Sequence, residues 1–145
     1  MSDDFVDKVI QVNRVSKKTT GGNKISFSVL MVAGDKKGHV GVGLGKAGDV
    51  ASAVRKAASY ARKHTILVPI YHATIPHELR IKKGAAKILL KPAPPGTGIR
   101  AGGAVRAVVE AAGIKNIVSK ILGTDNKASN VYATFEGLKM LRKRT

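Results

Sequence analysis

Residues 21–63 place the strictest constraint on the fold, because their pattern changes from a period of two to a helical period within one short span. Apolar and small polar side chains alternate over 25–32, and apolar residues alternate with glycine over 40–44. Both patterns predict β-strands, and the β-branched residues of 5–17 predict another strand before them. After Asp49, apolar residues recur at helical spacing, which predicts an amphipathic helix capped by Asp49.

The third predicted strand would have one face without side chains, formed by Gly41, Gly43 and Gly45. Such a face lets a helix or another backbone approach closely. Residues 43–48 also fit the dinucleotide fingerprint G-x-G-x-x-G, but a preceding hairpin and no acidic residue about 20 positions onward argue against it. A nucleotide-binding enzyme, in which Gly43, Gly45 and Gly48 would hold a pyrophosphate, is one alternative.

The charge balance predicts a polyanionic partner. The 145 residues include 26 Lys and Arg against 9 Asp and Glu, which gives a formal net charge of +17. The cations are dispersed along the chain, so the folded body itself is expected to bind nucleic acid or an anionic membrane surface. A nonspecific DNA-binding or architectural protein would share this charge and is the second alternative.

No residue pattern predicts catalysis, a cofactor or a metal site. The chain has no cysteine, its nine acidic residues are scattered, and no motif supports its histidines as metal ligands. Apolar residues make up 43%, enough for a core, but no run is long enough to span a membrane. The N-terminus is acidic, with Asp3 and Asp4 and no cation among residues 1–5, which does not fit a signal or transit peptide, so a cytosolic protein is expected.

The predicted nucleic-acid site combines a hairpin tip with the outer surface of the predicted helix. With aromatic residues at only 4%, recognition by shape and phosphate is expected rather than base stacking. Gly21 and Gly22 would form the turn and, with Gly41, Gly43 and Gly45, permit close approach. The cationic positions are Arg14, Lys17, Lys18, Lys24, Lys46, Arg55, Lys56, Arg62 and Lys63.

The second half of the chain is expected to alternate strand and helix. Pro69 and Pro76 bracket a predicted seam, which gives two domains at 3–68 and 73–145. The predicted segments are a short extended run at 66–70, a buried strand at 88–90, a glycine- and proline-rich loop at 91–103, a helix at 101–112 ended by Gly113, a strand at 114–118, and a last helix capped by Asn126 that reaches Leu141.

Five segments, in order, resemble the bacterial small-subunit ribosomal protein S five family over nearly the whole chain. They are GGNKISFSVLMVAGD, HVGVGLGKAGDVASAVRKA, TIPHEL, KPAPPGTGIRAGGAVRAVVEAAGI and ASNVYATFEGLKML. The resemblance implies an α+β protein, with an N-terminal β-β-β-α domain like the double-stranded-RNA-binding fold and a C-terminal α/β domain of the S-five domain-two type. It also implies a non-enzymatic component of cytoplasmic ribosomes that binds small-subunit ribosomal RNA, supports assembly and affects decoding accuracy.

The resemblance further implies where partners bind. The basic hairpin, Arg14 to Lys24 with Gly21 and Gly22, would reach into ribosomal RNA, and the last helix would pack toward ribosomal protein S eight. Together with ribosomal proteins S three and S four, the family lies near the mRNA entrance. Its interface with ribosomal protein S four maps to Gly96, Thr97, Gly98, Gly102, Gly103 and Arg106.

Overall fold

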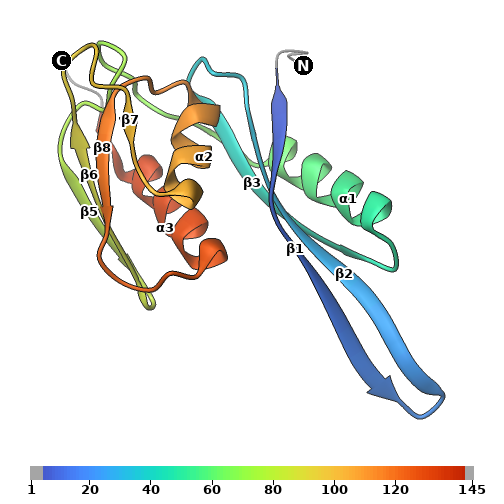
Figure 1. Cartoon of the computed structure of the whole chain (residues 1–145). Helices are drawn as coiled ribbons and strands as arrows, with labels where there is room; N and C mark the ends of the chain where they lie inside the picture. Colours follow the sequence, from blue (N-terminus) through green and yellow to red (C-terminus); the bar gives the residue numbers. More distant parts are fainter. Residues whose placement is uncertain (1–4, 143–145) are drawn as a thin grey trace.

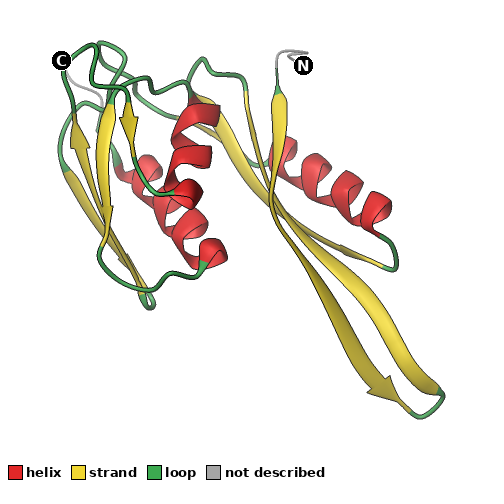
Figure 2. Cartoon of the chain, viewed as in Figure 1, coloured by secondary structure: helices red, strands yellow, loops and turns green. Residues whose placement is uncertain are grey.

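The computed structural model describes residues 5–142 and has two four-stranded sheets within them (Figure 1). The elements are β1 Val6–Thr19, β2 Gly22–Gly34, β3 His39–Ala47, α1 Val50–Lys63, β4 Thr65–Leu67, β5 Leu79–Lys83, β6 Ala86–Pro92, β7 Ile99–Arg100, α2 Gly103–Ala112, β8 Ile117–Ile121 and α3 Lys127–Met140. Figure 2 shows α2 and α3 between the two sheets, while α1 covers the opposite face of the N-terminal sheet. This arrangement confirms the predicted α+β class.

The N-terminal sheet has the strand order β1-β2-β3-β4 with antiparallel pairing throughout. Its glycine face receives α1: a Cβ added to Gly41, Gly43 or Gly45 would overlap carbonyl oxygens of that helix. The helix presents equally small residues there, because its buried positions are Ala53, Ala57 and Ala61. The predicted N-cap is also confirmed, since the Asp49 side chain accepts a hydrogen bond from the Ser52 N–H at 3.3 Å.

A β-bulge in β1 connects this sheet to the second half of the chain. The register with β2 shifts between Val9 and Gln11, which leaves Ile10 without a partner in the ladder. Ile10 instead packs against the main core cluster, which includes residues of the C-terminal sheet and helices. A bulge re-aims one side chain without ending the strand, so β1 can continue into the hairpin.

The C-terminal sheet has the order β5-β6-β8-β7, in which only the β7–β8 pair is parallel. Its helices also contact the N-terminal sheet, because Val32 and Val42, on the face opposite α1, belong to the same core cluster as Val105 and Val108 of α2. The two halves therefore share one core, and the division into domains at 3–68 and 73–145 stays a prediction. Residues 1–4 and 143–145 lie outside the described residues. They include the acidic start of the chain and the outer ends of the two predicted domains.

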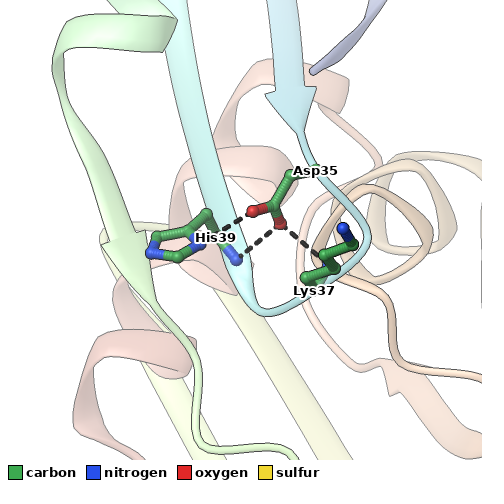
Figure 3. Close-up of polar contacts among 3 residues, drawn as sticks. All are labelled: Asp35, Lys37 and His39. Carbon is green, nitrogen blue, oxygen red and sulfur yellow. Dashed lines mark hydrogen bonds and ion pairs between the residues drawn. The ribbon is translucent and has the colours of Figure 1, made fainter. Parts of the chain in front are cut away.

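A buried carboxylate organises the turn between β2 and β3 (Figure 3). Asp35 Oδ1 accepts hydrogen bonds from the backbone N–H groups of Lys37 at 2.8 Å and His39 at 3.0 Å, and Oδ2 accepts from His39 Nδ1 at 2.8 Å. Burial alone would raise the pKa of Asp35, but the hydrogen bonds from Lys37 and His39 outweigh it and hold the pKa below its ordinary value.

The same turn is bonded to the C-terminal end of α2. The backbone N–H of Lys36 donates to the Ala111 carbonyl at 3.0 Å, and that of Gly38 donates to the Ala112 carbonyl at 2.8 Å. These bonds satisfy two carbonyls that a helix end leaves without intrahelical partners. Gly113 ends α2 with φ 97°, and a Cβ there would overlap the Lys36 backbone.

Two predicted boundaries in the second half were wrong. The strand expected at 114–118 is β8, which begins at Ile117 because the Ile114 N–H still bonds the helix carbonyl of Val109 and the next two N–H groups bond Ala73. The helix expected from Ala101 begins at Gly103, because Gly102 is its N-cap and has an extended backbone conformation with ψ 160°. Of the extended run 66–70, only the beginning pairs as part of β4.

β5 was not predicted from the sequence, and it pairs with β6 in a tight antiparallel hairpin. Three of the five residues of β5 are cationic, which obscured the alternation of Leu79 and Ile81 with exposed Arg80 and Lys82. The C-terminal half therefore begins with a hairpin rather than a single strand followed by a helix.

We expect Gly43→Ala to destabilise the protein by about 1–3 kcal/mol, because the new methyl group would overlap the α1 backbone. Gly48→Ala is the matched control, since a Cβ there meets no atom within 4 Å. Urea unfolding followed by circular dichroism gives both free energies. Equal stability of the two variants would contradict close packing of α1 on the glycine face.

We expect Asp35→Asn to lower the free energy of unfolding by about 1–3 kcal/mol at pH 7, because a buried, triply hydrogen-bonded carboxylate is lost. Since the folded-state pKa lies below the unfolded value, the carboxylate stabilises the fold above about pH 4 and this contribution is lost as the pH falls further. The difference between wild type and variant should therefore shrink at pH 3. Asp125→Asn, at an exposed position, is the control. A difference of the same size at both pH values would show that the Asp35 charge is not involved.

Candidate nucleic-acid interface

The β1–β2 hairpin extends well beyond α1 and the C-terminal half (Figure 1). Pairing with β3 ends at Phe27, so the outer part of β1 and β2 is a two-stranded ribbon. Thr20 and Gly21 form its turn, and Gly22 follows with φ 121°, a conformation that favours glycine. A ribbon without a third strand has no core of its own, so this part of the chain is available to a partner.

The predicted hairpin cations are all exposed, and within residues 5–142 none of Arg14, Lys17, Lys18 and Lys24 forms an ion pair. Lys17 lies directly opposite Lys24 in the antiparallel ladder. Like charges at directly opposed positions destabilise a hairpin. An external anion between them would remove this repulsion, so the hairpin favours an anionic partner.

The outer surface of α1 carries the next group of predicted residues. Arg55, Lys56 and Lys63 are exposed on it, with Arg55 donating to the Ser52 hydroxyl at 3.1 Å. Arg62 differs, because its guanidinium binds both carboxylate oxygens of Asp7, at 2.8 and 3.3 Å. The Arg62 charge is therefore partly neutralised within the chain and is less available to an external phosphate.

The structure divides the predicted positions between two surfaces. Cross-strand partners share a face of the sheet, and the Gly43 and Gly45 positions face α1, so the side chain of Lys46 projects from the opposite face. Lys17 and Lys24 follow that opposite face along β1 and β2. Lys46 is still linked to the helix, since its carbonyl accepts a hydrogen bond from Lys56 Nζ at 3.2 Å.

One aromatic pair on the cationic helix surface was missed in the sequence analysis. Tyr60 and His64 stack with ring centroids 4.0 Å apart and an interplanar angle of 19°. The spacing of four residues, which puts side chains on one helix face, was the available signal. The low aromatic content instead predicted recognition of nucleic acid by shape and phosphate, without base stacking.

The residues predicted to contact ribosomal protein S four lie in one continuous segment. Gly96 and Gly98 have positive φ in the loop before β7, and Gly98 N–H donates to Asn116 Oδ1 at 3.0 Å. Gly102 is the N-cap of α2. The Arg106 side chain is 53% exposed, and its Nε lies 3.4 Å from Glu110 Oε1. The segment also includes Thr97 and Gly103.

The geometry contradicts the nucleotide-binding alternative. Gly43 and Gly45 lie in an antiparallel strand and face a helix backbone that leaves no space for a pyrophosphate.

No group of three or more potential ligand side chains among residues 5–142 could hold a metal ion. In the same described range, no helix is both long and apolar enough to cross a membrane.

Comparison with known proteins places both halves of the chain in one family. Residues 5–69 match the description "Ribosomal protein S5, N-terminal domain" and residues 81–145 match "Ribosomal protein S5, C-terminal domain". A relative from Chloroflexus aurantiacus is 53% identical over 132 residues, covering 91% of this chain and 74% of its own length. A relative from Thermotoga maritima is 51% identical over 139 residues, covering 96% of this chain and 78% of its own length. A third, from Syntrophobacter fumaroxidans, is 50% identical over 138 residues, covering 95% of this chain and 83% of its own length. All three relatives have the name "Small ribosomal subunit protein uS5". The two domain matches and the identity to these relatives show that the chain belongs to the ribosomal protein S5 family.

Proposed function

We propose that this protein is a structural, non-enzymatic component of the small ribosomal subunit that binds small-subunit ribosomal RNA. One observation supports this most directly: the hairpin projects from the body, and its cations, including the directly opposed Lys17 and Lys24, form no ion pair with any residue of 5–142. The names of its relatives point to the same particle, and thus to the cytoplasm.

The hairpin would bind by neutralising phosphates rather than by reading bases. Cations that contact phosphates release condensed counterions, which gives affinity that falls with salt. The absence of side chains at Gly21 and Gly22 would let the ribbon enter a groove or the space between RNA helices. Lys46 and the exposed cations of α1 would then contact RNA on the two sides of the sheet.

Further roles are proposed from family membership. The segment from Gly96 to Arg106 would contact ribosomal protein S four, and α3 would pack toward ribosomal protein S eight. The protein would support subunit assembly and decoding accuracy. It would also lie, with ribosomal proteins S three and S four, near the mRNA entrance. The exposed side chain of Arg106 and the open surroundings of Gly96, Gly98 and Gly103 are compatible with a protein contact.

A nonspecific DNA-binding protein would share the net charge but not the family match. A sucrose gradient of cell lysate, blotted for this chain at moderate and high salt, separates the two functions. We expect the chain to migrate with the small subunit at both salt concentrations. A signal at the top of the gradient, or one that follows chromosomal DNA, would contradict the proposed function.

We expect replacement of Lys17, Lys18 and Lys24 by Ala to weaken binding to small-subunit ribosomal RNA and to flatten its salt dependence. Each lost phosphate contact should reduce the slope of log K against log salt by about 0.7–0.9, so three contacts remove about 2–3 in total. Filter binding at several salt concentrations measures this slope.

The matched control removes three exposed lysines from the C-terminal sheet, Lys82, Lys87 and Lys120, which lowers the net charge equally. We expect a smaller change of slope in this variant. A hairpin variant with the wild-type slope, or a control variant with the same reduced slope, would argue against a specific role of the hairpin.

A further inference from the structure

A shallow hollow of about 470 Å³ lies on the outer surface of α1. Its lining residues are Arg55, Lys56, Ser59, Tyr60, Lys63 and His64. Tyr60 is 51% exposed although it is a large aromatic residue on a helix whose opposite face is well packed. An exposed aromatic ring in a surface hollow is available for contact with a ligand.

The Tyr60 ring is held in place before any ligand binds. His64 stacks on it at 4.0 Å with nearly parallel planes, and His64 Nδ1 donates to the Tyr60 carbonyl at 2.9 Å. This hydrogen bond fixes the imidazole, which in turn supports the tyrosine ring from one side. Little rotamer freedom then remains to be lost on binding, which favours affinity.

The charges around the ring are all positive. Arg55, Lys56 and Lys63 line the hollow with no acidic residue among its lining residues. A ligand that offered only phosphate would leave the exposed ring unused, and an apolar ligand would leave the three cations unused. A flat ring beside three cations instead matches a nucleotide, whose base stacks on aromatic side chains while its phosphate pairs with lysine or arginine.

We propose that this hollow binds an unpaired nucleotide of RNA, with the base stacked on Tyr60 and the adjoining phosphate held by Lys56 and Lys63. The proposal rests on the RNA-binding function proposed above and adds a local preference for a nucleotide outside a helix. Duplex RNA keeps its bases stacked on one another, so only an unpaired base can use the Tyr60 ring. The contact is sequence-tolerant, because every base has an aromatic face.

The test compares two RNA duplexes that differ only by one unpaired nucleotide in one strand, each titrated with the full chain at several salt concentrations. We expect wild type to prefer the duplex with the unpaired nucleotide by about 5- to 150-fold, the range of one base–aromatic stack. Tyr60→Ala should abolish the preference without changing the salt slope, because stacking involves no counterion release. Tyr60→Phe should retain the preference, whereas replacing Lys56 and Lys63 by Ala should flatten the slope.

Tyr71→Ala is the matched control, since Tyr71 is also exposed, at 37%, and pairs edge-on with His72 away from α1. Tyr71→Ala should have the wild-type preference and the wild-type salt slope. Thermal unfolding checks that each variant is folded. Equal wild-type affinity for the two duplexes, with strong binding to both, would overturn the stacking site while leaving the proposed function intact. A preference unchanged in Tyr60→Ala, or lost equally in Tyr60→Phe, would also overturn it. Binding to a poly-glutamate peptide but to neither RNA would overturn both proposals and assign the surface to an acidic protein partner.

Discussion

Both halves of the structure depend on the two faces of β2 and β3. One face has no side chains along β3 and receives the backbone of α1, so these elements approach more closely than side chains would allow. The other face supplies Val32 and Val42 to the core formed with α2 and the C-terminal sheet. Because strands alternate their side chains between faces, one short sequence pattern specifies both contacts.

The charge distribution leaves much of the surface without internal compensation. With 26 cationic and 9 acidic residues, most lysines and arginines have no carboxylate partner available. Three ion pairs of the described residues, Lys83–Glu136, Arg106–Glu110 and Lys139–Glu136, are exposed on both sides, and such pairs contribute little stability. Repulsion among the remaining cations disfavours the folded state of the free protein, and a bound polyanion would relieve it, so folding stability and the binding of a polyanion are physically linked.

Local patterns predicted the N-terminal half well. Alternation and glycine spacing identified β2 and β3, and Asp49 with its apolar stripe identified α1 and the position where it begins. Two of the misses depend on contacts distant in sequence. The Arg62–Asp7 ion pair joins residues 55 positions apart, and β8 starts late because residues just before it bond Ala73. The Tyr60–His64 stack is different, because it is a local contact that the spacing of four residues could have indicated.

The turn around Asp35 explains how the hairpin acquires a fixed direction relative to the rest of the protein. Asp35 closes the turn on one side, and backbone bonds from Lys36 and Gly38 attach it to the end of α2. Since β2 runs without interruption from the hairpin tip into this turn, α2 orients the outer ribbon through a continuous strand. The outer ribbon is thus connected through β2, the turn and α2 to the Gly96–Arg106 segment, which ends in the first turn of α2. Loss of the Asp35 carboxylate would therefore loosen the orientation of the hairpin without removing any of its charges.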